Sequence, residues 1–239
     1  TNNTERMQIT SSGNVGIGQQ QGTSSTANQR LLINADAQGG IGHGLYIHND
    51  SYSAGSARIA LGPRYTFSYN TSPYIESLSE STSAAALIFG TTTGTTAREA
   101  MRIDSAGIVT KPYQPCFSVR RNTSQTYNAN TDPVVALNDK HFDVGNNFNT
   151  STYRFTAPVA GKYLFTAVIQ FGANGTSHSC FYINGANSRD GWADFGDGTA
   201  STQTRILTLT SGDYVELKAY SDQTTVLTNR SRMTGFLIG

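Results

Sequence analysis

The C-terminal half of the chain alternates between apolar and polar residues with a period of two. This alternation is clearest in "GKYLFTAVIQF", residues 161–171, and in "GDYVELKAY", residues 212–220. Successive side chains of a β-strand point to opposite faces of a sheet, so the pattern is typical of strands that bury one face. The predicted buried faces comprise Tyr163, Phe165, Ala167, Ile169 and Phe171 in the first stretch, and Val215, Leu217 and Ala219 in the second.

The other face of the 161–171 strand is also partly apolar, because it carries Leu164 and Val168. A strand with two apolar faces is covered on both sides, and we expect the second cover to come from a neighbouring subunit. Turn signals such as "APVAG", "NGAN" and "SGD" recur between the predicted strands. Together these features predict an antiparallel β-sandwich or jelly roll.

The N-terminal half has only short apolar runs, broken by glycine and polar residues. The runs "LLINA", "GLYIHN", "ARIALG" and "ALIFG" are typical of short strands. The stretch "STSAAALIF" has helical propensity, but its Ser/Thr-rich start and the run into Gly90 favour a strand. A monomer built from such pieces would bury too little apolar surface to offset its chain entropy. Three chains wound together would solve this, because each would bury its apolar stripe against the other two.

One phrase occurs twice in this half, as "ERMQITSSGNVGIG" at residues 5–18 and "EAMRIDSAGIVTKP" at residues 99–112. Both copies follow the order strand, glycine turn, strand, and we interpret them as the two ends of one shaft module. The alternative is that two β-hairpins merely share a period. The residues that the second copy keeps in register are Glu99, Met101, Ile103, Ser105, Gly107 and Val109.

The aromatic residues divide the chain near residue 111. Residues 1–111 hold seven of them and residues 112–239 hold seventeen, including the only Trp. Aromatic side chains dominate the burial energy of a core, so we expect a compact domain at 112–239 and a β-rich shaft module at 1–111. The proline-containing stretch "TKPYQP", residues 110–115, is the predicted joint.

Composition and charge exclude several classes of function. Only 14% of the residues are charged and the formal net charge is +1, so we expect no nucleic-acid partner, which would require a basic patch. No apolar run approaches the roughly 20 residues that span a bilayer, and we expect no membrane insertion. The first residues carry no secretory signal and begin inside a motif, so we expect a longer parent chain. Cys116 and Cys180 are expected to be free thiols.

Motifs that support catalysis are not found in the sequence. It has no Cys-x-x-Cys pair, no His-Glu-x-x-His stretch and no Gly-x-Ser-x-Gly elbow. The "GGIGHG" stretch, residues 39–44, lacks the Lys-Ser/Thr that completes a phosphate-binding loop. His43 and His48 either face solvent or meet across a trimer axis, where they would hold a metal or an anion. We predict no catalytic residue, no metal ligand and no cofactor other than, as an alternative, calcium.

The polar stretch "NSRDGWADFGDGTAS", residues 187–201, is the candidate binding site. Trp can stack on a sugar while neighbouring carboxylates accept hydrogen bonds from its hydroxyls, which favours saccharide or receptor contact. Two other interpretations remain open: oxygen ligands for calcium, or an inter-strand core Trp with turn-forming aspartates. A pair of carboxylates for glycoside hydrolysis has little support here. The candidate residues are Arg189, Asp190, Trp192, Asp194, Phe195 and Asp197.

The stretch "LNDKHFDVGNNFNTSTYRFTAPVAGKYLFTA" resembles the signature of the complement-1q-type globular head, a jelly roll related to tumour necrosis factor. It departs at Leu137, where the family has Phe, and at Ala167, where the family has Phe or Tyr. "LTLTSGDYVEL" and the C-terminal "MTGFLIG" resemble later strands of the same family. The resemblance implies a homotrimer with aromatic strands around its axis. The residues expected in the core or at the trimer contact are Phe148, Phe155, Tyr163, Phe165 and Phe236.

The repeated phrase resembles a signature of bacteriophage tail fibres and related receptor-binding proteins, in which it lies in trimeric β-rich shafts. The expected fold is therefore all-β, with a trimeric fibre shaft followed by an antiparallel jelly-roll head. We expect a structural virion protein, the distal part of a tail fibre, that binds a host cell-surface glycan or protein outside the cell. A missing N-terminal part would join other virion tail proteins.

Three alternatives to the tail-fibre interpretation remain. The first is structural: a head fibre, a decoration protein or a purely trimerising module. The second is a polysaccharide depolymerase. The third is a bacterial surface adhesin.

Overall fold

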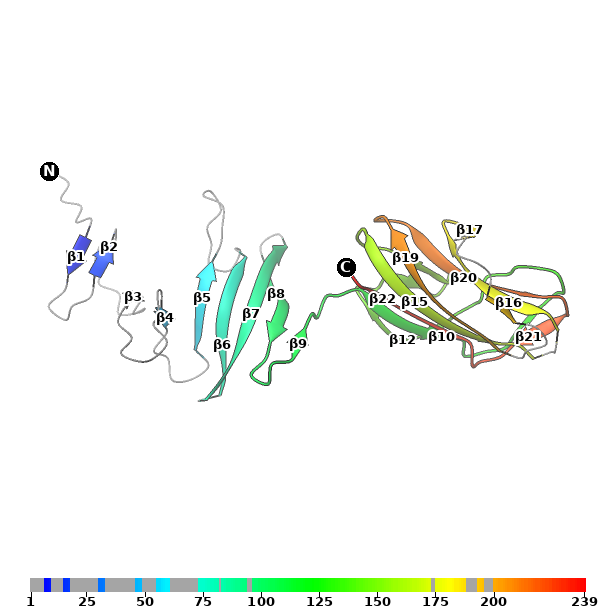
Figure 1. Ribbon diagram of the computed structural model, residues 1–239, viewed down its shortest axis with the longest axis horizontal. Coiled ribbons are helices and arrows are strands. Elements are labelled where there is room, and N and C mark those ends of the chain that lie inside the picture. Colours follow the sequence, from blue (N-terminus) through cyan, green and yellow to red (C-terminus); the bar gives the residue numbers. More distant parts are fainter. Residues whose placement is uncertain are drawn as a thin grey trace. The chain divides into compact units, whose positions relative to one another are not determined.

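The structure is a computed structural model in which every regular element described is a β-strand. It describes residues 7–9, 15–17, 30–32, 46–48, 55–60, 73–81, 83–93, 96–172, 175–187, 193–195 and 200–239. The chain divides into two compact units, Thr1–Pro112 and Tyr113–Gly239 (Figure 1). All strand pairs are antiparallel, which confirms the predicted all-β class.

Unit 1 contains two short hairpins and one larger sheet. The hairpins pair β1 (Met7–Ile9) with β2 (Val15–Ile17), and β3 (Arg30–Leu32) with β4 (Tyr46–His48). The five-stranded sheet follows chain order and consists of β5 (Ser56–Ala60), β6 (Tyr74–Ser81), β7 (Ala84–Thr93), β8 (Thr96–Ile103) and β9 (Val109–Thr110).

The two copies of the repeated phrase form the same local structure. In the first copy β1 pairs with β2, and in the second the end of β8 pairs with β9. The second copy turns at Gly107, which has a φ of +82° that suits glycine. The Asp104 carboxylate closes this turn by accepting hydrogen bonds from the backbone N–H groups of Ala106 and Ile108, at 2.9 and 2.8 Å. The described residues of each copy therefore form a pair of antiparallel strands, and in the second copy the turn between them is the predicted glycine turn.

The larger sheet of unit 1 has two unlike faces. On one face Tyr74 is buried against Gly90, where an added Cβ would lie 2.0 Å from the Tyr74 ring. The Arg58 guanidinium stacks 3.7 Å from the centroid of the same ring and pairs with Glu76 at 2.7 Å. The other face carries a cross-strand row of apolar residues, of which Ile59 is 41% exposed. This row comprises Ile59, Ile75, Phe89 and Met101.

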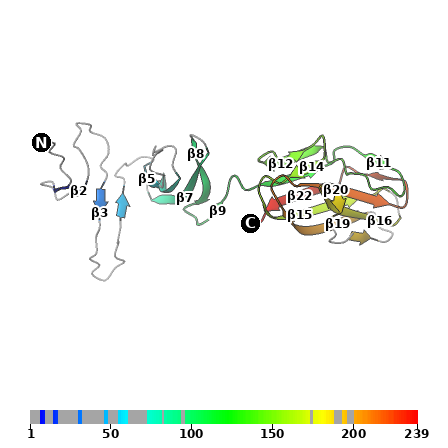
Figure 2. The ribbon, with the colours of Figure 1, turned by 90° about the horizontal axis from the view of Figure 1, so that it is seen from above.

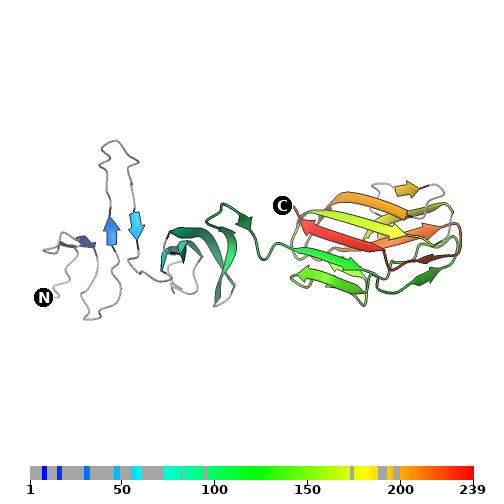
Figure 3. The same ribbon diagram turned by 90° about the horizontal axis from the view of Figure 1, so that it is seen from below.

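Unit 2 is a sandwich of two antiparallel sheets (Figures 2 and 3). The five-stranded sheet has the order β12 (Asp139–Val144), β10 (Cys116–Arg120), β22 (Arg232–Leu237), β15 (Gly161–Gln170) and β19 (Ala200–Leu209). The six-stranded sheet has the order β13 (Phe148–Asn149), β14 (Arg154–Thr156), β20 (Tyr214–Ser221), β16 (Ser177–Ile183) and β17 (Ala186–Asn187), with β18 (Ala193–Phe195) also on β16. A separate pair joins β11 (Gln125–Tyr127) to β21 (Thr225–Leu227).

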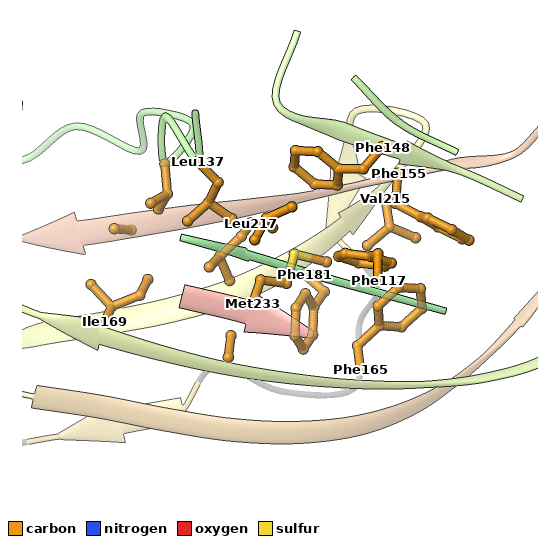
Figure 4. Packing of buried hydrophobic residues seen from close by; sticks show 14 of the residues in the cluster. Phe117, Leu137, Phe148, Phe155, Phe165, Ile169, Phe181, Val215, Leu217 and Met233 are labelled. Carbon is orange, nitrogen blue, oxygen red and sulfur yellow. The ribbon is translucent and has the colours of Figure 1, made fainter. Parts of the chain in front are cut away.

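One hydrophobic core fills the space between these sheets (Figure 4). Phe117 stacks on Phe155 with ring centroids 4.9 Å apart, and Phe155 meets Phe165 edge to face at 5.6 Å. The residues predicted to be buried in 161–171 and 215–219 all lie in this core, so the period-two interpretation is confirmed. Leu137 and Ala167, which depart from the family signature, are also fully enclosed.

Gly235 lies at a point in the core that has no room for a side chain. An added Cβ would lie 2.6 Å from Phe117 Cε1 and 2.8 Å from Phe165 Cδ1. Because overpacking a core costs about 1–3 kcal/mol, Gly235→Ala should lower the free energy of unfolding by that amount. Chemical denaturation followed by the fluorescence of Trp192, the only Trp, measures it. Gly239→Ala, which meets no atom within 4 Å, is the matched control. Equal stabilities of the two variants would contradict the packing argument.

Candidate interaction surface

The outer face of the five-stranded sheet of unit 2 carries a continuous apolar row. The strand register places Cys116 between Val144 and Phe236, and it places Leu164 between Phe236 and Ile206. Phe236 is 45% exposed and Ile206 is 57% exposed in the single chain. We call these residues, Val144, Cys116, Phe236, Leu164 and Ile206, the apolar row. It crosses all five strands, and such a contiguous exposed apolar surface marks an interaction site.

The next outward-facing row consists mainly of hydroxyl side chains. Thr234 lies between Ser118 and Thr166, and Thr166 faces Thr204 with their hydroxyl oxygens 3.4 Å apart. Phe142, next to Ser118, ends this row and is 46% exposed. The surface therefore changes from apolar to polar within one step along the strands.

The outer face of the six-stranded sheet is rich in aromatic and charged residues, and these side chains contact one another. The buried Glu216 carboxylate accepts a hydrogen bond from Arg154 Nε at 2.9 Å, and Lys218 Nζ lies 3.7 Å away. Arg154 also lies 4.0 Å above the Tyr214 ring, and Lys218 lies 4.2 Å above the Tyr182 ring. Because Arg154 and Lys218 share the Glu216 carboxylate and each lies against a tyrosine ring, these described side chains form a packed structural layer on this face.

Two carboxylates within the stretches that resemble the family, Asp143 and Asp213, hold turns through hydrogen bonds. The Asp143 side chain accepts hydrogen bonds from the backbone N–H groups of Asn147 and Phe148, both at 3.0 Å, and so fixes the turn that inserts Phe148 into the core. Asp213 accepts from the Asn184 amide and from Thr210, and these hydrogen bonds lower the pKa of its carboxyl below the ordinary value. These contacts give both carboxylates a local structural role.

Arg121 is buried at the end of the five-stranded sheet that lies away from Tyr113. Its guanidinium donates hydrogen bonds to the carbonyls of Thr123 and Ala136, at 2.6 and 3.1 Å, and to the Gln125 side chain. Burial lowers the pKa of Arg121 and raises the pKa of Tyr127 beside it. The Tyr127 hydroxyl donates to the Val134 carbonyl at 3.1 Å.

The candidate residues of the 187–201 stretch cannot be assigned to a site. Arg189, Asp190, Trp192 and Asp197 lie outside the described residues. Asp194 and Phe195 belong to β18, whose backbone pairs with His178 and Ser177 of β16, and their side chains are not described. The proposed saccharide, receptor and calcium contacts of this stretch therefore stay predictions. His43 also lies outside the described part of the chain.

The aromatic residues predicted for the core or trimer contact fall into two groups. Phe148, Phe155, Tyr163 and Phe165 are at most 2% exposed and lie in the core. Phe236 points outward in the apolar row. The apolar row as a whole was missed by sequence reasoning, although the apolar second face of 161–171 was a signal for it.

Metal sites and membrane-spanning helices were also considered among the described residues. Within them, no group of three His, Cys, Asp or Glu side chains is arranged to hold a metal ion. Also within them, no helix is long and apolar enough to cross a membrane. Cys116 and Cys180 are both free thiols, the first half-buried and the second buried.

Comparison with known proteins identifies unit 2. The family model "C1q domain" matches residues 116–238. The chain belongs to the C1q domain family. Domains of this family are typically binding modules without enzymatic activity, and they commonly form homotrimers.

Solved structures similar to the C1q domain cover about half of the chain. The globular domain of zebrafish complement 1qA has 23% sequence identity, a TM-score of 0.43, and coverage of 53% of this chain and 98% of its own. Murine APRIL has 10% identity, a TM-score of 0.42, and coverage of 52% of this chain and 99% of its own. A search of curated protein sequences finds no match.

Burial of Tyr127 predicts that the C1q domain loses stability in alkali. A free phenol has a pKa of about 10, and burial raises the pKa of Tyr127 in the folded chain above this value. Above about pH 10 the unfolded chain releases this proton while the folded chain retains it, so the free energy of unfolding falls as the pH rises. Each such group contributes up to about 1.4 kcal/mol per pH unit.

Denaturation followed by circular dichroism between about pH 8 and pH 11 measures this slope. Tyr127→Phe should be less stable at neutral pH, because it loses the hydrogen bond to Val134, but its stability should decline less steeply above pH 10. Identical slopes for the variant and the parent chain would show that Tyr127 does not titrate as argued.

Proposed function

We propose that the chain is the distal part of a trimeric bacteriophage tail fibre whose C1q domain binds a receptor on the host cell surface. The observation that carries this proposal is the apolar row on the outer face of the five-stranded sheet. A lone domain would leave Phe236 and Ile206 in contact with water, whereas three copies packed around an axis would cover them. The tendency of the family to form homotrimers supports the same arrangement.

Unit 1 supports the fibre part of the proposal. The row of Ile59, Ile75, Phe89 and Met101 leaves an apolar sheet face open in the single chain. Three copies that pack through this face would form a shaft, and a trimeric shaft joins a trimeric head without a change of symmetry. The repeated phrase at 5–18 and 99–112, which resembles tail-fibre sequences, connects this architecture with tailed phages.

Receptor binding suits the end of the C1q domain that lies away from Tyr113. β10 starts near this residue and runs to Arg120, so the loops that follow β10, precede β22 and join β20 to β21 lie at the far end. Loops presented by a rigid sandwich are the usual place for binding residues. Three identical heads on one fibre would raise the overall affinity of a weak site by about 10²–10⁴.

Substitution of the apolar row tests the trimer. Burial of a phenylalanine contributes about 1.5–3 kcal/mol, so Phe236→Ser should shift the protein from trimer towards monomer at micromolar concentration. Light scattering on a sizing column gives the mass, and the single chain is 25.6 kDa. Val226→Ser is the control, because Val226 is 38% exposed and lies on β21, outside the apolar row. A parent chain that is a stable monomer would refute the proposed assembly.

Binding to bacteria tests the receptor function. Fluorescently labelled protein should bind cells of some strains in a panel and should compete with phage adsorption to those cells. If the 187–201 stretch contacts the receptor, Trp192→Ala should weaken this binding about tenfold or more. Tyr113→Ala, which removes a 55% exposed aromatic residue from the joint, should have no effect. A trimer that binds no cells would favour a purely structural fibre module. Release of reducing sugar ends from envelope polysaccharide would favour a depolymerase instead.

A further inference from the structure

A row of arginines ends the outer face of the five-stranded sheet. Arg120 on β10 lies directly opposite Arg232 on β22, and both side chains point to the same outer face as the apolar row. Arg230 is exposed in the turn that leads into β22. This end of the sheet lies away from Tyr113, on the far side of the hydroxyl row. We call Arg120, Arg230 and Arg232 the arginine row.

Few negative charges balance the arginine row. Arg120 pairs with Asp139 at 2.7 Å, and this is an exposed pair. Among the described residues, no carboxylate forms an ion pair with Arg230 or Arg232. Arg121, next to Arg120 in the chain, is buried and donates hydrogen bonds to two backbone carbonyls and a side-chain amide, with no carboxylate among these partners. Among the described residues of the five-stranded sheet, this end therefore has more arginines than carboxylates, although the whole chain has a net charge of only +1.

Like charges placed opposite each other on neighbouring strands destabilise a sheet. Three copies of the chain, packed through the apolar row, would bring three arginine rows towards one another at the same end and increase this repulsion. A ligand with several negative charges would remove the repulsion and would gain charge-assisted hydrogen bonds from guanidinium groups. An arrangement that is unfavourable without a ligand indicates a binding site.

We propose that the arginine row binds acidic polysaccharide. Guanidinium groups match the planar pair of oxygens on carboxylate, sulfate and phosphate groups, and the neighbouring hydroxyls of Ser118 and Thr234 are suited to hydrogen bonds with sugar hydroxyls. The inference rests on the proposed function, because it names the chemical class of the receptor that the fibre head would recognise.

The test measures binding of the full chain to immobilised dextran sulfate, with neutral dextran of the same length as the reference surface. The parent chain should bind dextran sulfate, should not bind dextran, and should bind more weakly as the salt concentration rises. Arg232→Gln should weaken binding about tenfold, and the double variant R230Q/R232Q should weaken it further. Lys162→Gln removes the same charge from the opposite end of the same face and should change the affinity less than about twofold.

Two results from this experiment would overturn the proposal. The first is a parent chain that does not bind dextran sulfate. The second is an equal loss for Lys162→Gln and Arg232→Gln, since binding would then reflect general positive charge.

Thermal unfolding and light scattering of the same variants test whether the arginines have a structural role instead. Because Arg232 contributes repulsion without a ligand, Arg232→Gln should leave the trimer intact and should keep or raise its Tm. A lower Tm together with dissociation of the trimer would mean that Arg232 pairs with a carboxylate of a neighbouring copy, and the ligand site would be refuted.

The cell-binding experiment separates failure of this inference from failure of the proposed function. If the protein binds bacteria, and neither dextran sulfate nor the R230Q/R232Q double variant reduces that binding, the fibre function stands and the arginine row is not its receptor site. If the arginine row binds dextran sulfate but the protein binds no bacteria, the acidic polysaccharide site stands and the receptor function fails.

Discussion

The position of β22 between β10 and β15 is the constraint on which the rest of the C1q domain depends. The last strand of the chain lies at the centre of the five-stranded sheet, so the sheet is complete only when β22 has paired with residues at least 64 positions earlier, as in the pair Val168 and Arg232. Its inward side chain Met233 and the bare backbone at Gly235 close the core over Phe117 and Phe165. The same register sets the outer surface, because Phe236 bridges the two halves of the apolar row and Arg232 is brought opposite Arg120.

This dependence explains how far the sequence could predict the molecule. The alternation in 161–171 and 212–220 follows from local geometry alone, and the predicted buried faces are the ones found in the core. The spacing of Asp143, Phe148 and Phe155 also has a local cause, since one carboxylate holds the turn that sets the first of these rings. The sequence indicated two members of the apolar row, Leu164 and Phe236, but not the row itself, because its five residues come from five strands and become neighbours only through the register. Arg120 and Arg232 are 112 positions apart in the chain, and no local pattern links them. The binding loop at 187–201 stays a prediction from residue chemistry.

Each of the two units leaves an apolar row exposed in the single chain, and association with further copies of the chain would bury both rows. In unit 1 the face that buries Tyr74 and the Arg58–Glu76 pair is closed, while the opposite face leaves Ile59 exposed. In the C1q domain the inner faces are closed by the core, while the apolar row is open. In each case the open row itself consists of uncharged residues, so it matches another copy of itself better than a charged partner. Self-association is thus the simplest arrangement that buries both surfaces.

The outer faces of the two sheets of the C1q domain differ in the partners of their cationic side chains. On the six-stranded sheet one carboxylate, Glu216, contacts both Arg154 and Lys218, and a tyrosine ring lies beside each cation. At the arginine row of the five-stranded sheet, Asp139 pairs with Arg120, and no described carboxylate pairs with the exposed Arg230 or Arg232. Both sheets have the same alternation and the same core, so folding does not require the second arrangement. A chain with so few charges that still concentrates unpaired guanidinium groups at one end of one sheet has placed them where a negatively charged partner can reach them.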